Sequence, residues 1–133
     1  MMTRDEQRQL LQTARVIAMV GHSDKPNRIS YQIAQKLRGW GYTVHPVNPL
    51  VRTIDGHVSY PALADVPGSI DIVSVFRAAE HLPAVVQDAI ARDAGAVWAQ
   101  LGVTHPEAAR WAEAAQLPIV MDRCIKVAYQ ELL

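Results

Sequence analysis

The chain has 133 residues, half of them hydrophobic and a fifth charged, with 13 lysines and arginines against 13 aspartates and glutamates. The resulting net charge of zero gives no reason to expect nucleic acid or an anionic membrane as a partner. The single cysteine cannot form an internal disulfide, and no apolar stretch reaches the roughly 18 residues of a membrane span. The charged N-terminus also lacks the apolar segment of a signal peptide. These properties predict one globular cytoplasmic domain, residues 1–133.

The first predicted element is an N-terminal helix, residues 1–14, packed on the rest of the domain. The sequence "TRDE" at positions 3–6 has the form of a capping box, in which Thr3 caps the helix and Glu6 reciprocates. Leu10, Leu11 and Ala14 then form an apolar stripe that such a helix can bury.

Five short apolar runs follow, and each has the length of a strand. They are continuous, as in "VIAMV" or "IVSVF", without the polar alternation of a half-exposed strand. Continuous runs are typical of parallel strands that are covered on both faces. The predicted strands are Val16–Val20, Thr43–Val47, Asp71–Phe76, Ala96–Leu101 and Pro118–Met121.

Helical patterns lie between these runs. Residues 29–40 space their apolar side chains as one helix face, and residues 82–90 form a cleaner stripe that ends at Gly95. A second capping-box sequence, "THPE" at 104–107, predicts a helix that begins after Thr104 and ends before Pro118. Residues 48–70 break the alternation and predict only a short edge strand near Val58–Tyr60 and one helical turn in "PALADV".

Alternating strands and helices predict an α/β fold, a single doubly wound and mostly parallel sheet with helices on both faces. If the short edge strand is counted, the sheet has six strands and the expected order is 3-2-1-4-5-6. The first and fourth strands are then neighbours, and open α/β sheets bind ligands at this switch point, outside the carboxyl ends of the strands. We therefore expect "GHSDKPNR" (21–28) and "RAAE" (77–80) to face each other across one crevice.

The loop after the first strand has features of an anion site. Gly21 lets the backbone approach a ligand, and the following helix offers free N–H groups at its positive end. Ser23, Lys25 and Arg28 add donors suited to phosphate. The loop matches neither G-x-G-x-x-G nor G-x-x-x-x-G-K-[ST], however. An ordinary turn with solvated charges is the alternative interpretation.

The end of the second strand indicates which nucleotide would fit. NAD sites place an acidic residue there to hold the ribose hydroxyls. This chain has "PVNPLVR" instead, with Asn48, Pro49 and Arg52 and no carboxylate. An amide beside an arginine can accept a phosphorylated ribose, which a carboxylate would repel. Coenzyme A (CoA) and NADP both meet that description.

Taken together, these segments resemble the Rossmann-type CoA-binding domain. That domain occurs in small stand-alone bacterial proteins and at the N-terminus of the succinyl-CoA synthetase alpha subunit, and the stand-alone proteins are the closer match. The resemblance runs from about Arg15 to Lys126. It is carried by "VIAMVGHSDKPNRISYQIAQKL", "GYTVHPVNP", "IDGHVSYPALADVPGSIDIVSVFR", "VWAQLGV" and "VMDRCIK".

The resemblance implies CoA or acyl-CoA binding in the switch-point crevice. Gly21, Ser23 and Arg28 are expected near the phosphates and Asn48 and Pro49 beside the adenosine, whereas His22 occupies a position that is often small in the family. The full set of expected CoA-binding residues is Val20, Gly21, His22, Ser23, Lys25, Arg28, Asn48, Pro49, Phe76, Arg77, Gln100 and Gly102.

The sequence contains no recognisable set of catalytic groups. No Ser-His-Asp order, paired carboxylate or Gly-x-Ser-x-Gly elbow is present, and the five histidines lack metal-ligand spacing. We interpret Cys124 as a buried, inert cysteine, with a mixed disulfide to CoA as the alternative. The sequence thus favours a CoA-binding domain without catalysis of its own. A small NADP-dependent oxidoreductase, an acyl-CoA ligase component that needs a partner chain, and a protein-interaction module without ligand stay open, as does a homo-oligomer.

Overall fold

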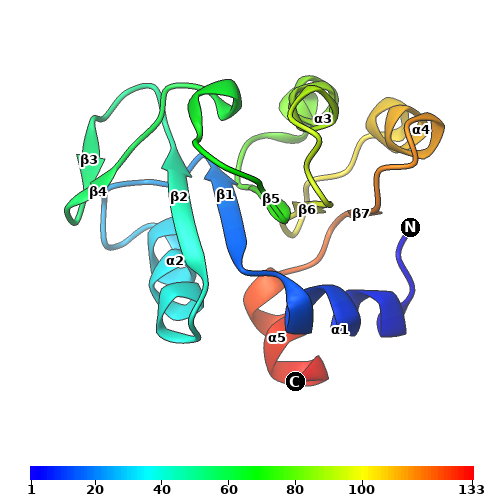
Figure 1. The fold of residues 1–133 in the computed structure, drawn as a ribbon, viewed down its shortest axis with the longest axis horizontal. Coiled ribbons are helices and arrows are strands. Elements are labelled where there is room, and N and C mark those ends of the chain that lie inside the picture. The colour runs from blue at the N-terminus through cyan, green and yellow to red at the C-terminus, as the bar shows by residue number, and fades with distance from the viewer.

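Five parallel strands form the central sheet of the computed structural model, which describes residues 1–133 (Figure 1). All five predicted strands are present, and the last three are shorter than the apolar runs that predicted them. Residues at the ends of those runs lie in turns, as Leu101 does with 62% of its surface exposed. The strands are β1 (Val16–Val20), β2 (Thr43–Val47), β5 (Ile72–Val75), β6 (Val97–Ala99) and β7 (Ile119–Val120).

Five helices cover the two faces of this sheet. Helices α3 (Leu82–Ala91) and α4 (Pro106–Ala114) pack on one face, whereas α1 (Arg4–Thr13), α2 (Ile29–Gly39) and α5 (Ile125–Leu132) pack on the other, as the upper and lower layers of Figure 1 show. The strand order is β2-β1-β5-β6-β7, with every pair parallel. The predicted α/β class with helices on both faces is confirmed.

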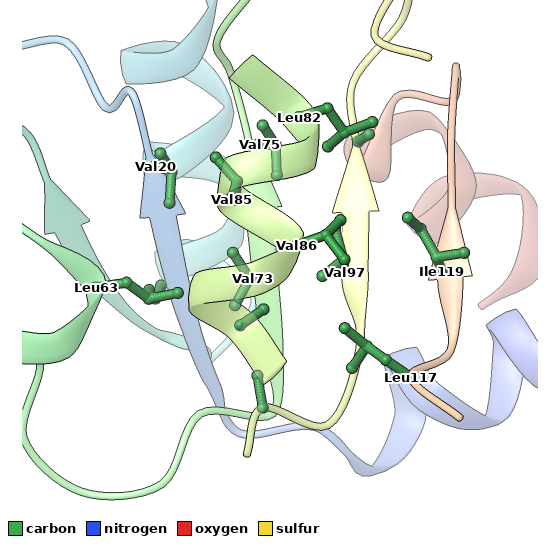
Figure 2. Packing of buried hydrophobic residues seen from close by; sticks show 14 of the residues in the cluster. Val20, Leu63, Val73, Val75, Leu82, Val85, Val86, Val97, Leu117 and Ile119 are labelled. Carbon is green, nitrogen blue, oxygen red and sulfur yellow. The ribbon is translucent and has the colours of Figure 1, made fainter. Parts of the chain in front are cut away.

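The alternation of side chains along each strand builds two separate cores. In β1, Ile17 and Met19 are fully buried against α1, α2 and α5, while Ala18 and Val20 are buried toward α3 and α4. Figure 2 shows the second of these cores, where α3 lies over the valines of β5 and β6. Each fully buried aliphatic side chain contributes about 1.5–3 kcal/mol, which explains why the strands are predominantly apolar.

The segment between β2 and β5 differs from the prediction. Two-residue strands β3 (Thr53–Ile54) and β4 (His57–Val58) form an antiparallel hairpin instead of an edge strand. Asp55 and Gly56 between them have φ values of 49° and 81°, which is the backbone of a tight two-residue hairpin turn. Because His57 and Val58 pair with β3, only Tyr60 remains to pair with β2, through a parallel bridge to Val47.

Tyr60 nevertheless marks the predicted edge position. Its N–H donates to the Pro46 carbonyl and its carbonyl accepts from the Asn48 N–H, both at 2.9 Å. With this bridge counted, the order 3-2-1-4-5-6 is correct, although the third strand is a single residue. The predicted helical turn is also present, as the 3-10 turn η1 (Leu63–Asp65).

The two capping-box predictions have different outcomes. At α1 the box is complete, because the Thr3 N–H donates to Glu6 Oε1 at 2.8 Å and the Glu6 N–H donates to Thr3 Oγ1 at 3.2 Å. At α4 the predicted cap is wrong by one residue. Pro106 is the first helical residue, so His105 is the N-cap, and its Nδ1 accepts from the Glu107 N–H at 3.2 Å. Thr104 lies outside the helix.

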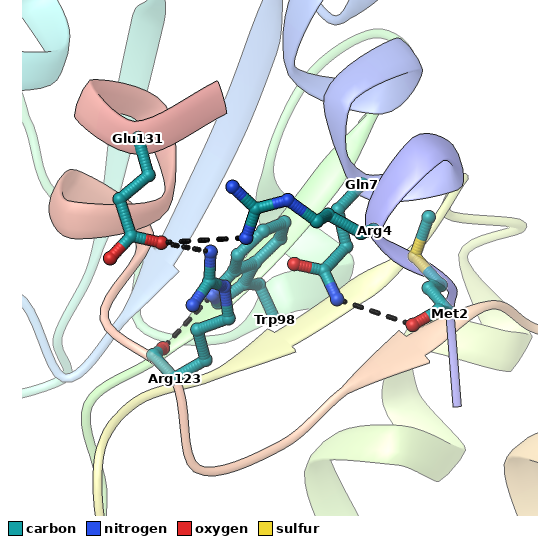
Figure 3. A network of polar contacts seen from close by, with 6 residues as sticks. All are labelled: Met2, Arg4, Gln7, Trp98, Arg123 and Glu131. Atoms are coloured by element: carbon teal, nitrogen blue, oxygen red, sulfur yellow. Dashed lines mark hydrogen bonds and ion pairs between the residues drawn. The ribbon is translucent and has the colours of Figure 1, made fainter. Parts of the chain in front are cut away.

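The N-terminal residues complete the β7 side of the sheet. The Met2 N–H donates to the Ile119 carbonyl at 3.2 Å, and Gln7 Nε2 donates to the Met2 carbonyl at 3.2 Å. Glu131 on α5 pairs with Arg123 at 2.9 Å and with Arg4 of α1 at 4.0 Å, as Figure 3 shows. The N-terminal helix is thereby tied to both the last strand and the last helix.

None of these helices combines the length and the apolar character that crossing a bilayer requires.

Candidate functional site

The loops after β1 and β5 lie in contact at the carboxyl ends of the strands. Gly21 has a φ of 89°, and a Cβ atom built on it would lie 2.5 Å from the Phe76 carbonyl oxygen and 3.1 Å from Arg77 Cγ. No larger side chain fits between the two loops. The segments 21–28 and 77–80 therefore meet where the strand order predicts, since the chain leaves β1 toward α2 and β5 toward α3 on the opposite face.

Two hollows open at this meeting point. The first, here called the α2 hollow, has a volume of about 520 Å³ and lies between the start of α2 and the loop after β2. Its lining residues are Gly21, Ser23, Asp24, Lys25, Arg28, Ile29, Ser30, Asn48, Leu50, Val51 and Phe76.

The second, here called the α3 hollow, has a volume of about 480 Å³ and reaches η1 and the start of α3. Its lining residues are Val20, Gly21, Val47, Asn48, Pro49, Leu50, Pro61, Ala62, Leu63, Phe76, Arg77, Ala78, His81, Val85 and Asp88. Four residues, Gly21, Asn48, Leu50 and Phe76, line both hollows, so the two form one groove across the strand ends. Each volume is in the range of small-molecule sites.

Three cationic side chains border the groove without an acidic partner. Lys25 and Arg28 line the α2 hollow and Arg77 lines the α3 hollow, and all three are exposed. None belongs to any of the ion pairs of the structure, although Asp24 and Asp88 also line the groove. Arg28 is the N-cap of α2 and its side chain makes no capping bond, so the first N–H groups of the helix stay open to the hollow. This side of the groove suits an anion.

Side-chain hydrogen bonds hold the first loop in place. The Ser23 N–H donates to Ser30 Oγ and the Lys25 N–H donates to Ser23 Oγ, both at 3.0 Å. Asn48 joins this loop to the next one, because its Nδ2 donates to the His22 carbonyl and its Oδ1 accepts from the Leu50 N–H, both at 2.9 Å. The Asn48 side chain thus fixes the groove floor through one donated and one accepted hydrogen bond.

His22 lines neither hollow. Its side chain is completely buried behind the loop, with Nδ1 at 2.8 Å from the Ser23 carbonyl and Nε2 at 3.3 Å from Arg38 Nη1. Burial lowers the pKa of His22 from 6.5 to about 4, and the Arg38 charge acts in the same direction. The imidazole is therefore neutral at pH 7 and belongs to the packing beneath the site.

Gln100 and Gly102 also lie outside both hollows. Gln100 follows β6, next to the end of β5, where its N–H donates to the Val75 carbonyl at 3.2 Å. Gly102 is exposed, and its N–H donates to Asp122 Oδ1 at 2.7 Å. Cys124 is buried at the start of α5 with 7% of its surface exposed. The sequence predicted Gln100 and Gly102 along the strand ends beside the ligand, but the groove does not extend to them or to Cys124.

Several groove residues were missed from the sequence. Leu50 is 89% exposed on the rim, and its place directly after "NP" was the available signal. Pro61, Ala62 and Leu63 carry no chemical signal, because only the path of the chain over β1 brings η1 to the α3 hollow. His81 enters from the N-cap position of α3 and Asp88 from its second turn.

Another hollow, of about 350 Å³, lies at the opposite end of the sheet between α1, α5 and the end of α2. Its aromatic residues already have partners. Trp40 stacks on Tyr129 with ring centroids 3.9 Å apart, and the Tyr42 hydroxyl donates to the Leu11 carbonyl. No loop from the carboxyl ends of the strands reaches this hollow, which we interpret as helix packing.

The fold and the position of the groove define a Rossmann-like α/β domain with a crevice at the switch point of its sheet. The family model described as a CoA binding domain matches residues 15–130, and the chain belongs to this family. The resemblance found from the sequence is thereby confirmed.

Similar proteins include both small and large chains. The uncharacterized protein YneT of Bacillus subtilis is 37% identical over 127 residues, which are 96% of this chain and 94% of YneT. The ADP-forming acetate–CoA ligase I of Archaeoglobus fulgidus is 30% identical over 79 residues, 59% of this chain but 12% of the ligase. A solved structure from Thermus thermophilus, cell-free ID.343, has a TM-score of 0.94 at 34% identity and covers 99% of this chain and 100% of that one.

Proposed function

We propose that the chain binds CoA or an acyl-CoA in the groove. One observation carries this proposal: two hollows of different character join at Gly21. Lys25 and Arg28 border one of them, and the other is largely apolar and is bordered by Arg77. None of these three cations has an acidic partner. CoA combines a pyrophosphate and a ribose phosphate with an adenine ring and a long uncharged arm, so it needs both kinds of surface. Membership of the CoA binding domain family supports the same ligand.

The arrangement of groups suggests how the ligand lies. We assign the pyrophosphate to the α2 hollow, where Ser23, Arg28 and the open N–H groups of α2 converge. We assign the adenosine to the segment that follows β2, where Pro49 and the exposed Leu50 offer apolar surface. Phe76 then borders both hollows, and Val20 and Arg77 line the α3 hollow beside it. Gln100 and Gly102 would be reached only by a ligand that extends past Phe76 along the strand ends.

The polar groups of the groove favour binding over catalysis. The two hydroxyls of the α2 hollow, on Ser23 and Ser30, both accept hydrogen bonds from backbone N–H groups of the same loop, and neither forms a hydrogen bond with a side chain that could act as a base. A nucleophile without an adjacent base has little reactivity at its ordinary pKa. We therefore propose that the domain itself holds CoA without transforming it.

A ligand series tests the proposal directly. CoA, dephospho-CoA, NADP, NAD and ATP are compared by isothermal titration calorimetry and thermal shift on the full chain. CoA should bind, and at 100 times its dissociation constant it should add about 2.7 kcal/mol to the free energy of unfolding. Dephospho-CoA, which lacks the ribose phosphate, should bind more weakly. Stabilisation by NADP alone would support an oxidoreductase instead, and no response to any ligand would leave an interaction module.

Arg28 offers the sharpest single test of the anion side. Arg28→Ala should weaken CoA binding by about 1.5–3 kcal/mol, since a hydrogen bond to a charged group is lost. Arg110→Ala, on the exposed surface of α4 and outside the groove, removes the same charge and should leave the dissociation constant unchanged. Equal constants for both variants and the wild type would remove Arg28 from the site.

A second function follows from the Archaeoglobus match. Because a CoA ligase contains a region similar to this chain, the domain would supply the CoA-binding part of a ligase whose other parts lie on a partner chain. The test is a mixture of the chain with ATP, acetate and CoA. Formation of ADP and acetyl-CoA by the chain alone would show that it needs no partner and would overturn the proposal of binding without catalysis.

We also propose that the protein works in a reducing compartment such as the cytoplasm, because its single cysteine is buried and unpaired.

A further inference from the structure

The buried side chain of His22 stands directly behind the candidate phosphate loop. Its two ring nitrogens meet groups of opposite kind, the Ser23 carbonyl at Nδ1 and the Arg38 guanidinium at Nε2. A carbonyl can only accept and a guanidinium can only donate a hydrogen bond. The two partners therefore select the neutral tautomer of His22 in which Nδ1 carries the proton and Nε2 is the acceptor.

Arg38 reaches His22 from the far end of α2. Its Nη2 donates to the Val44 carbonyl at 2.9 Å, and its Nη1 lies 3.3 Å from His22 Nε2. The guanidinium thus bridges β2 and the imidazole, in a half-buried position that lowers the pKa of Arg38. Arg38 lines neither hollow, so it cannot touch a ligand in the groove.

The bonds of His22 fix the backbone that faces the ligand. The imidazole holds the Ser23 carbonyl, the His22 carbonyl accepts from Asn48, and the Ser23 N–H is held by Ser30. Ser23 lines the α2 hollow directly, and the loop continues from it into the N-terminus of α2. A rotation of the His22 ring would release the Ser23 carbonyl and let this backbone move.

We propose that Arg38 and His22 are positioning residues for the anion side of the groove. Arg38 fixes the orientation and tautomer of His22, and His22 fixes Ser23 and the entry to α2 in the geometry that receives a ligand phosphate. The proposal rests on CoA binding in the groove. It explains why a chain with Gly21 and Ser23 facing the ligand carries a large, buried polar side chain between them.

The experiment compares two substitutions on the same helix. Arg38→Met removes the donor but keeps the apolar stem of the side chain, and Lys36→Met removes an exposed cation of α2 two residues away. Isothermal titration calorimetry with CoA should show about a tenfold loss of affinity for Arg38→Met, which corresponds to one hydrogen bond, and no change for Lys36→Met. Arg38→Lys keeps the charge without the planar fork and should not restore the affinity.

The imidazole ¹⁵N chemical shifts of His22 report its tautomer directly. They would not change if Arg38 contributed only to the stability of the fold. In the free wild-type protein His22 should show a protonated Nδ1 and a bare Nε2, and Arg38→Met should mix the two tautomers. A wild-type His22 with its proton on Nε2 would overturn the proposal whether or not any variant folds. An asparagine at position 22 reaches Ser23 but not Arg38. In the His22→Asn background, adding Arg38→Met should therefore cause no further loss of CoA affinity.

The possible failures can be told apart. If the wild type does not bind CoA, the proposed function fails and the positioning role fails with it. If the wild type binds CoA and Arg38→Met binds as tightly as Lys36→Met, only the positioning role is overturned. Full restoration of affinity by Arg38→Lys would likewise overturn it, in favour of a simple effect of charge.

Discussion

Two loops of this molecule share a pattern and differ in their surroundings. The β1–α2 loop (21–28) and the β6–α4 loop (100–105) both leave a central parallel strand at its carboxyl end, and each has a glycine with positive φ, 89° at Gly21 and 79° at Gly102. A Cβ on Gly21 would collide with the Phe76 carbonyl, whereas a Cβ on Gly102 would meet nothing within 4 Å.

The difference arises from the strand order. At β1 the chain crosses to α2 on one face, and its neighbour β5 leads to α3 on the other, so the two loops diverge and a groove opens between them. On the β5 side of β6 the crossovers, α3 and α4, lie on the same face, whereas β7 on its other side leads to α5 on the opposite face. No residue of the β6–α4 loop lines either hollow. Of these two similar turns, only the one beside the β1–β5 junction borders the groove.

The largest expected effect tests the difference in packing between Gly21 and Gly102. Gly21→Ala should lower the free energy of unfolding by about 3 kcal/mol and abolish CoA binding, because the new Cβ both clashes with the Phe76 backbone and strains a left-handed residue. Gly102→Ala carries only the conformational strain and should cost about 1 kcal/mol. Urea denaturation measures both. Similar losses for the two variants would show that the loops are not differently packed.

Acid should destabilise the molecule through the first loop. The folded pKa of His22, about 4, lies below its unfolded value of 6.5, so the unfolded state binds more protons between these pH values. The stability contribution is complete above pH 6.5 and is lost as the pH falls toward 4, a loss on the order of 2 kcal/mol. Arg38 and His57 oppose protonation of His22, and Asp55 favours it.

His22→Gln should flatten this pH dependence, and His57→Gln, at an exposed position of the β3–β4 hairpin, should retain it. The measurement is urea denaturation at intervals between pH 7 and pH 4. An unchanged slope in His22→Gln would assign the acid sensitivity to another group, with His45, whose pKa burial also lowers, as the first to examine.

The smallest expected effect concerns the β6–α4 loop and tests which of its residues caps α4. His105→Ala removes the N-cap acceptor of α4 and should cost about 0.5–1 kcal/mol, whereas Thr104→Ala should stay within about 0.5 kcal/mol of the wild type. Thermal denaturation of the two variants decides between the caps. A larger loss of stability in Thr104→Ala than in His105→Ala would instead support Thr104 as the N-cap, as the sequence predicts.

Much of the fold was accessible from the sequence because apolar runs and helical stripes report burial directly. Val16–Val20 and Thr43–Val47 were predicted residue for residue. The β3–β4 hairpin was missed because two-residue strands leave no periodic pattern, and the Asp55–Gly56 turn was its only signal. Short elements held by turn chemistry are thus harder to predict than long buried ones.

The parts of the site that depend on local sequence could be predicted, and the parts that depend on contacts between distant residues could not. Gly21 and Asn48 follow directly from their positions after strands. The orientation of His22 depends on Arg38, which lies 16 residues further along the chain and on another element. The far wall of the groove depends on η1 crossing over β1 to bring Leu63 into place. Neither long-range contact has a signature in a single sequence.

The backbone hydrogen bond from Met2 to Ile119 has a consequence for self-association. An unprotected outer strand invites a neighbouring chain to extend the sheet, which is a common route to fibres. Here Met2 pairs with one residue at the β7 margin and Tyr60 with one residue at the β2 margin, so each flank offers a neighbouring chain fewer free backbone groups than a bare edge strand would.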